Sequence, residues 1–232
     1  SSSSAASDVY KRQAEEVMIG RDIALAEVTG GRLHVMHVST AGGVALVRAA
    51  KARGARVTAE ACPHHFTLTD ECLRGFDSNF KMSPPLRTAD DVEAIMAGLA
   101  DGTLDCIATD HAPHAREKKM LELDRAPMGI LGLETAVGLS VTRLVNTGRI
   151  GWPRLIEAMS TLPARILGVN RGTLRPGAIA DITLIDPNLV WQVDVRKFCS
   201  KSVNSPFHGW TLTGRAVATI VAGRVKHRLA AS

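Results

Sequence analysis

Apolar residues in the first half of the chain follow two alternating spacings. Stretches with an apolar residue every three or four positions, the spacing of one helix face, cover residues 14–29, 44–53 and 88–99. Short apolar runs typical of buried strands cover residues 33–38, 56–61 and 105–108. Glycines follow all three helical stretches, where helices commonly end. Strands that alternate with helices over short connections predict βαβ units with parallel strands, and therefore an α/β fold.

The second half of the chain changes character near residue 171. Helical periodicity continues over residues 133–145 and 155–167. Pro153 and Pro163 suit the first turn of a helix. After a turn-rich connection, alternating β-branched segments cover residues 180–185, 189–193 and 215–225. We therefore divide the chain into an α/β part, residues 14–170, and a small β module, residues 171–232.

Residues 1–13 show neither apolar periodicity nor a helix-capping pattern, and we expect them to be disordered. The run from Asp8 to Gln13 also resembles the translation of a sequencing-library adapter. We therefore interpret residues 1–13 as foreign to the natural protein and leave them out of the expected fold.

Composition restricts the classes of partner. The chain of 232 residues is 45% hydrophobic and 22% charged, which suits a globular protein with a sizeable core. Its net charge of +5 comes from scattered lysines and arginines, and aromatic residues make up only 4%, so we expect no nucleic-acid binding. No apolar run approaches the ~20 residues of a membrane-spanning helix. We therefore expect a cytoplasmic protein without membrane contact, and, because the 4 cysteines form no CxxC pair, without structural disulfides.

Histidine and aspartate gather where the predicted strands end. Asp110 follows the third predicted strand in the run Asp110-His111-Ala112-Pro113-His114, where it could bind a metal or carry a proton. An isolated aspartate here would more often form an Asx-turn that caps the next segment. The two neighbouring histidines instead favour a role for Asp110 in metal binding or proton transfer. His37 ends the first predicted strand and can point into a barrel mouth, and imidazole together with carboxylate suits a divalent ion such as zinc. His34 fits a structural histidine.

Five motifs occur in an order and spacing that resembles the dihydroorotases of the amidohydrolase superfamily, in their larger type I form. They are His37-Val38-Ser39-Thr40, Pro63-His64-His65, Ser83-Pro84-Pro85-Leu86-Arg87, Ile107-Ala108-Thr109-Asp110-His111-Ala112-Pro113-His114 and Met128-Gly129. Residues 177–186 also resemble the strand by which these enzymes return to a small β-sandwich. The resemblance covers residues 14–228. It implies the C-terminal part of a (β/α)8 TIM-type barrel, about strands six to eight, followed by a segment of the β-sandwich.

The resemblance also implies roles for the matching residues. His37 and Asp110 would bind zinc, within a binuclear site in the complete enzyme, and Asp110 would be the catalytic residue that shuttles the proton. The substrate-binding positions are His114, Ser83, Met128 and Gly129. His114 would hold the substrate carboxylate, and Glu60 matches a position that binds an additional metal in some relatives. The implied reaction opens or closes the cyclic amide of dihydroorotate, to or from N-carbamoyl-L-aspartate, in de novo pyrimidine synthesis.

Two departures from the family pattern leave alternatives open. Many relatives have Asn where Ser83 stands, and Ser would reach the substrate ring only through water. This change brings hydantoinases, dihydropyrimidinases and allantoinases into consideration. The sequence also lacks the His-x-His motif of a first strand, the bridging residue of strand four and the histidine of strand five. We therefore interpret the chain as a fragment that is inactive alone.

A further alternative is a non-catalytic dihydroorotase-like protein that serves as a structural partner of aspartate transcarbamoylase. Such proteins usually lose the metal ligands, whereas His37 and Asp110 are both present. For the complete protein we expect a small-molecule substrate, and either a homodimer or a complex with aspartate transcarbamoylase.

Overall fold

A computed structural model describes the backbone of residues 3–230, which fall into two compact units. The first unit comprises Ser1–Glu71 and Pro84–Ala108, and the second comprises Cys72–Ser83 and Thr109–Ser232. Among the described residues, no helix is both long and apolar enough to cross a membrane. The domain boundary near residue 170 stays a prediction.

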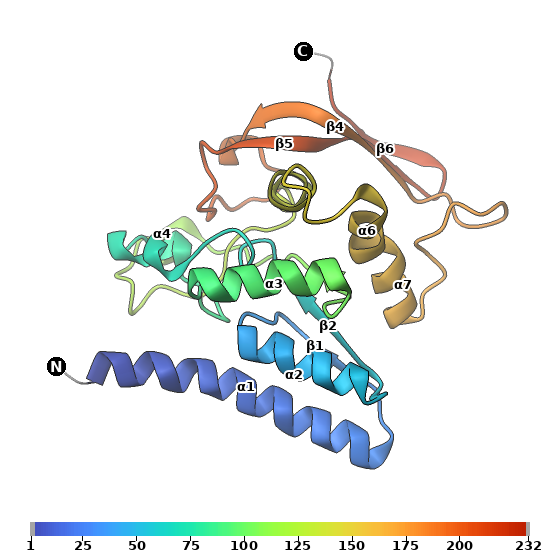
Figure 1. The fold of residues 1–232 in the computed structure, drawn as a ribbon. Helices are drawn as coiled ribbons and strands as arrows, with labels where there is room; N and C mark the ends of the chain where they lie inside the picture. Colours follow the sequence, from blue (N-terminus) through green and yellow to red (C-terminus); the bar gives the residue numbers. More distant parts are fainter. Residues whose placement is uncertain (1–2, 231–232) are drawn as a thin grey trace. The chain divides into compact units, whose positions relative to one another are not determined.

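The first unit begins with helix α1, Ser3–Thr29 (Figure 1). The expectation of disorder therefore differs from the structure for residues 3–13, while the first two residues of the chain lie outside the described part. Residues 3–13 contain no glycine and no proline, so nothing in the backbone stops the helix from extending into them. The helix ends at Gly30 as predicted. Gly30 is left-handed, with φ 65°, and Gly31 N donates to Ala26 O at 3.0 Å.

Strands and helices alternate in the first unit, as the sequence predicts. The elements after α1 are β1 (Leu33–Val35), α2 (Ala41–Ala52), β2 (Val57–Ala61), α3 (Ala89–Asp101) and β3 (Cys106–Ile107). The strands form a parallel sheet in the order β1-β2-β3, with Leu33 opposite Val57 and Glu60 opposite Cys106. In a parallel sheet the carboxyl ends of the strands lie at the same edge. The side chains that follow each strand therefore emerge on one side of this unit.

Helix α2 is the centre of the core of the first unit, because it contacts α1, α3 and β2. Figure 1 shows α1 running alongside α2. The buried side chains of α2 and α3 include Val44, Val47, Ile95 and Leu99. Each fully buried aliphatic side chain of this size stabilises the fold by ~1.5–3 kcal/mol. Gly98 permits the close approach of the two helices, since a Cβ there would lie 3.0 Å from Val44 Cγ1.

Helix α3 is capped at both ends, and its last cap is the glycine that follows the predicted helical stretch. The Asp91 carboxylate accepts hydrogen bonds from the backbone N–H of Thr88 at 3.3 Å and from its hydroxyl at 2.8 Å. At the other end, Gly102 adopts the left-handed conformation with φ 82°. The chain therefore enters β3 from a fixed position.

The second unit contains several short helical segments. The α-helices are α4 (Arg116–Lys119), α5 (Ala136–Ser140), α6 (Trp152–Ile156) and α7 (Leu162–Leu167). Two π-helical segments, η3 (Val141–Val145) and η4 (Glu157–Thr161), continue α5 and α6. The 3₁₀ segments are η2 (Ser78–Phe80), η5 (Val195–Lys197) and η1 (Asp70–Gly75), and η1 crosses the boundary between the two units. Pro153 and Pro163 lie in the first turns of α6 and α7, as predicted, and α7 follows directly after η4.

A three-stranded antiparallel sheet, β4-β5-β6, completes the second unit. Its strands are Ile182–Gln192, Thr211–Val221 and Arg224–Arg228. The two predicted segments 180–185 and 189–193 are one strand, interrupted by an irregularity between Asp186 and Val190. The predicted segment 215–225 is split, because Ala222 and Gly223, with φ 48° and 76°, form the tight turn of a hairpin.

Candidate active site

Two of the four non-glycine residues with positive φ in residues 3–230 are the predicted metal ligands. His37 has φ 53° and follows β1, which ends at Val35 and is shorter than predicted. Asp110 has φ 46° and follows β3, which ends at Ile107. A non-glycine residue held in a sparsely populated backbone region costs ~1–3 kcal/mol, and such residues cluster at functional sites. The backbone is thus strained at both positions where the sequence predicts a metal ligand.

Glu60, in β2, pairs with two histidines of the first strand region. Its Oε2 lies 3.1 Å from His34 Nε2, and its Oε1 lies 2.9 Å from His37 Nδ1. Burial would raise the pKa of this carboxyl, but the hydrogen bonds and charges of the two histidines outweigh burial and lower the pKa to about 2. Glu60 is therefore an anion throughout the physiological pH range.

The pairing with Glu60 orients the His37 ring for a metal. A ligating histidine commonly directs its second ring nitrogen to a carboxylate, which fixes the tautomer and raises the basicity of the ligating nitrogen. With Nδ1 toward Glu60, the nitrogen of His37 that would bind a metal is Nε2. His34 differs, because its Nδ1 also contacts Thr58 Oγ1 at 2.8 Å and both of its ring nitrogens have partners. This arrangement agrees with the structural role expected for His34.

The loop after β2 buries two neutral histidines. His64 and His65 are only 2% and 3% exposed, and their ring centroids lie 4.2 Å apart. Burial lowers the pKa of His64 well below its ordinary value. Burial also lowers the pKa of His65 to about 4, although its hydrogen bond to Pro84 O, at 3.0 Å, acts in the opposite direction. Both imidazoles are therefore uncharged at neutral pH.

The buried His65 makes the stability of this chain sensitive to acid. Its pKa is about 4 in the folded state, against an ordinary value of 6.5, so between these values the unfolded chain binds a proton that the folded chain does not. The free energy of unfolding should consequently fall as the pH falls from 6.5 to 4, by on the order of 3 kcal/mol from this group. We expect His65→Gln to flatten this dependence, measured by urea unfolding at several pH values. The exposed His227→Gln should keep the original slope, and equal slopes for His65→Gln and the unmodified chain would contradict the prediction.

In the second unit, His111 supports the backbone beside Asp110. Its Nδ1 accepts hydrogen bonds from Gly132 N at 3.2 Å and Leu133 N at 3.3 Å. Ala112 N donates to Ile130 O at 2.8 Å, so residues 110–114 and 128–133 are joined by several contacts. His111 therefore has a structural role here, since its acceptor nitrogen is already used.

Three of the four predicted substrate-binding residues lie together in the second unit. His114 Nε2 donates to Met128 O at 2.8 Å, which leaves Nδ1 as the ring atom available to a ligand. Gly129 has φ 122°, and a Cβ at this position would lie 2.5 Å from Ala112 Cβ and 3.2 Å from His114 Nε2. Only glycine fits this approach. Ser83, the fourth residue, is exposed and belongs to the same unit.

Asn204 holds this cluster together and was not identified from the sequence. Its side-chain Nδ2 donates to Ala112 O at 2.9 Å and to Gly129 O at 3.2 Å, while Oδ1 accepts from His114 N at 3.1 Å. Asn204 is buried, at 3% exposed, and uses both ends of its amide. A single asparagine ninety residues further along the chain gives no local signal of such a role. Only the tertiary structure identifies it.

Glu15 of α1 is a second residue that the sequence did not reveal. Its carboxylate accepts hydrogen bonds from the backbone N–H of Ser39 at 2.8 Å, from the Ser39 hydroxyl, and from Arg87 Nη2 at 3.1 Å. Arg87 Nε also donates to Ser39 Oγ at 3.1 Å. The motif residues Ser39 and Arg87 therefore serve to fix the segment that follows His37 onto α1.

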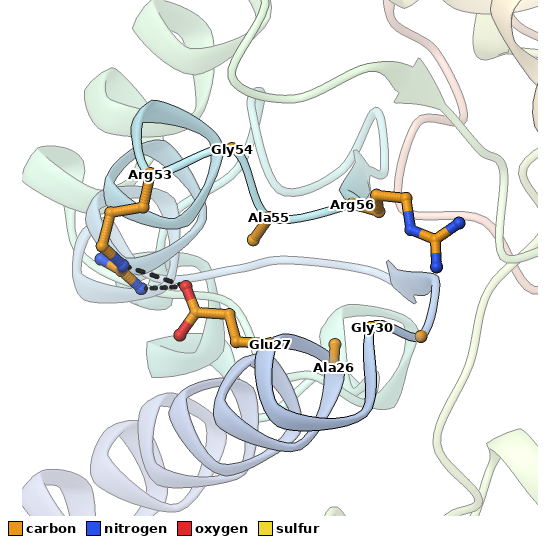
Figure 2. Close-up of a pocket in the computed structure, with 8 residues that line it drawn as sticks. Ala26, Glu27, Gly30, Arg53, Gly54, Ala55 and Arg56 are labelled. Atoms are coloured by element: carbon orange, nitrogen blue, oxygen red, sulfur yellow. Dashed lines mark hydrogen bonds and ion pairs between the residues drawn. The ribbon is translucent and has the colours of Figure 1, made fainter.

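A pocket of the first unit lies away from these residues. It is lined by Ala26, Glu27, Gly30, Gly31, Arg53, Gly54, Ala55 and Arg56. Figure 2 shows Glu27 paired with Arg53 across it, with Arg53 Nη2 at 2.8 Å from Glu27 Oε1. These residues precede β1 and β2, so the pocket lies at the amino ends of the strands. Enzymes with parallel barrels place their chemistry at the carboxyl ends, where His37 and the buried histidines occur.

Zinc fits the donor chemistry of the predicted ligands. Zinc accepts imidazole nitrogen and carboxylate oxygen, which are the donors of His37 and Asp110. The Glu60 anion beside His37 would further stabilise a bound cation. His37 belongs to the first unit and Asp110 to the second, and a shared ion stays a prediction. The described residues also contain a cluster whose chemistry suits a metal, formed by Cys62, His64 and His65.

Comparisons with known proteins agree on the family. The model of the amidohydrolase family matches residues 6–226. A dihydroorotase from Pelotomaculum thermopropionicum is 59% identical over 212 residues, which cover 91% of this chain and 50% of that protein. A dihydroorotase from Pelobacter propionicus is 56% identical over 217 residues, covering 94% of this chain and 51% of that protein. The chain thus spans about half the length of the curated relatives it matches.

Solved structures give the same result for the fold. A dihydropyrimidinase from Brevibacillus agri superposes with a TM-score of 0.89 at 27% identity, covering 94% of this chain and 49% of that one. An L-hydantoinase from Arthrobacter aurescens superposes with a TM-score of 0.85 at 32% identity, covering 93% of this chain and 50% of that one. The chain has the fold of these enzymes, and it belongs to the amidohydrolase family.

Proposed function

We propose that this chain is the C-terminal half of a dihydroorotase, a metal-dependent enzyme that opens or closes the cyclic amide of dihydroorotate in pyrimidine synthesis. The observation that carries this proposal is the 59% identity to a dihydroorotase over 91% of the chain. The parallel order β1-β2-β3, with a helix between successive strands, is consistent with strands six to eight of a (β/α)8 barrel. The sheet β4-β5-β6 would be a segment of the β-sandwich.

In this proposal His37 and Asp110 bind zinc in the binuclear site of the complete enzyme. Support comes from their strained backbones, from their positions after parallel strands, and from the Glu60 carboxylate that orients His37. Bound zinc would polarise the amide carbonyl and lower the pKa of the attacking water. The remaining ligands would come from the part of the relatives that this chain does not cover.

The residues of this chain would carry out proton transfer and substrate positioning. Asp110 would accept the proton of the attacking water and deliver it to the ring nitrogen as the carbon–nitrogen bond breaks. His114 would hold the substrate carboxylate, and its hydrogen bond to Met128 O would fix the position of the ring. The backbone at Met128 and Gly129 would line the same pocket, and the absence of a Cβ at Gly129 lets this backbone approach Ala112 and His114. Ser83 would contact the ring through water.

A cyclic amidohydrolase for substrates without a carboxylate is the second candidate. The similarity to a dihydropyrimidinase and a hydantoinase in structure favours it, and so does Ser83. His114 separates the two candidates, because only a substrate that bears a carboxylate gains from a hydrogen-bond donor at this position. The weaker identity of these neighbours, 27% and 32%, leaves the dihydroorotase assignment as the better supported one.

Assays on a complete protein that contains this half would test the assignment. We expect metal-dependent turnover of dihydroorotate and much slower turnover of dihydrouracil and hydantoin. His114→Ala should lower kcat/KM for dihydroorotate by roughly 10–100-fold, because a hydrogen bond to a charged group contributes ~1.5–3 kcal/mol. The exposed His208→Ala is the matched control in the same unit. Preference for hydantoin or dihydrouracil, with no effect of His114→Ala, would instead support the second candidate.

The location and assembly of the complete protein form the last part of the proposal. We keep the cytoplasmic location, which rests on the composition of the chain. A homodimer or a complex with aspartate transcarbamoylase is the expected assembly. Sedimentation of the complete protein with and without aspartate transcarbamoylase would distinguish these assemblies.

A further inference from the structure

The loop after β2 brings a thiol and two imidazoles together inside the first unit. One ligand atom from each of Cys62, His64 and His65 lies within 4.8 Å of the others. The three residues are 0%, 2% and 3% exposed. None of them is a predicted ligand of the catalytic metal, and the short loop that carries them belongs to a single unit. The cluster is therefore separate from the residues to which catalysis was assigned.

Each imidazole in this cluster has one ring nitrogen without a hydrogen bond. His64 Nε2 and His65 Nδ1 are buried and have no hydrogen-bond partner among the described residues. A buried polar atom without a partner costs ~1–3 kcal/mol, so two in one loop require an explanation. His65 Nε2 donates to Pro84 O at 3.0 Å, so in the neutral ring Nδ1 carries the lone pair. That lone pair is available to a cation.

We propose that Cys62, His64 and His65 form a binding site for one thiophilic d10 metal ion, Zn²⁺ or Cu⁺. A thiolate with two neutral imidazoles suits such ions, whereas Mg²⁺ and Ca²⁺ require oxygen donors. Both imidazoles are already uncharged, so binding breaks only the S–H bond of Cys62. Its proton leaves to solvent and the sulfur electron pair forms the bond to the metal. One proton is released for each ion bound, and no oxidant or reductant is needed.

This site would adjoin the candidate active site at the contact between Cys62 and His37. Cys62 Sγ lies 3.3 Å from His37 Nδ1, which also contacts Glu60. With Nδ1–H directed to Glu60, the Cys62 sulfur can only accept at this contact, and its conversion from a thiol to a metal-bound thiolate would change the charge that His37 faces. An ion at Cys62 would therefore affect the orientation of His37 from outside the catalytic ligand set.

Cobalt binding tests the proposal on the 232-residue chain, because Co²⁺ replaces Zn²⁺ and absorbs in the near ultraviolet only when a thiolate binds it. Under reducing, oxygen-free conditions we expect one Co²⁺ per chain with this absorption, displaced by Zn²⁺ or Cu⁺ but not by Mg²⁺. Cys62→Ala should abolish the absorption, and His64→Gln should weaken binding at least tenfold. Cys106→Ala, which alters another buried cysteine of the same unit, should leave binding unchanged.

Alkylation provides a second readout that does not depend on a variant folding. Mass spectrometry of the unmodified chain should show that Zn²⁺ or Cu⁺ slows alkylation of Cys62 but not of the exposed Cys199. Displacement by Zn²⁺ alone or by Cu⁺ alone identifies which ion the site prefers. Absence of thiolate absorption in the unmodified chain, or its persistence in Cys62→Ala, would overturn the proposal.

Discussion

Asp110→Asn in a complete enzyme should reduce turnover by roughly 10²–10⁴-fold while the protein remains folded, because the loss of a positioned general base has effects of this size. The amide keeps the shape of the carboxylate and can adopt the same left-handed backbone, since asparagine tolerates positive φ as well as aspartate does. It cannot accept a proton and binds a cation more weakly. In activation free energy the loss corresponds to about 3–5 kcal/mol, and weaker metal binding would increase it.

The measurement for Asp110→Asn is the kcat of metal-loaded protein, with metal content determined on the same sample. Asp186→Asn is a matched control in the same unit, because Asp186 Oδ1 accepts hydrogen bonds from Asn188 N and Leu189 N in a turn. Asparagine can make both hydrogen bonds, so that variant should keep its activity. Near-normal kcat in Asp110→Asn would assign the proton carrier to another residue.

The first unit was predictable from the sequence because its signals are local. Helical periodicity and the glycines that follow it indicate where α1 and α3 end. The parallel order of the strands follows from their short connections through helices. Strand lengths were less predictable, because the turn at His37 depends on tertiary contacts and not on the alternation of the preceding residues.

The second unit was harder to predict because tertiary contacts override its local pattern. Gly214 lies outside the predicted segment 215–225, yet in the structure it belongs to β5, with φ 85°, where a Cβ would lie 2.8 Å from Val141 Cβ. The turn lies at Ala222 and Gly223, inside the segment 215–225 that was predicted to be one strand. Alternation of side chains cannot by itself distinguish one long strand from a hairpin.

Parts of the candidate site could be predicted, and others could not. His37 and Asp110 stand out because chemically active side chains follow buried strands, whereas Glu15 and Asn204 act through contacts distant in sequence. Glu60 had only a weak signal as a possible metal ligand. In the structure the Glu60 carboxylate instead pairs with His37. Residues that orient others are recognised only when the folded contacts are known.

The 232-residue chain alone should not hydrolyse dihydroorotate, even with added zinc. A catalytic zinc site normally has three protein ligands and one open position, and a binuclear site requires more. The predicted set in this sequence contains only His37 and Asp110. His111 cannot complete it through Nδ1, which already accepts two backbone N–H groups, and His64 and His65 are buried in a separate cluster.

An exposed strand edge should also limit the isolated chain. In the sheet of the first unit β1 is at the edge, so its outer backbone groups have no strand partner in this sheet. Such an edge favours aggregation or pairing with another chain. Light scattering should therefore show aggregates of the purified chain that are larger than a dimer, which a complete protein would not form.

The decisive measurement compares three samples with equal zinc: the purified chain, a complete protein, and the purified chain mixed with the separately produced remainder of that protein. We expect turnover of dihydroorotate in the complete protein and none in the chain alone. Recovery in the mixture would assign the missing ligands to the remainder. Clear metal-dependent turnover by the chain alone would mean that its own histidines complete the site and that the assignment of ligands is wrong.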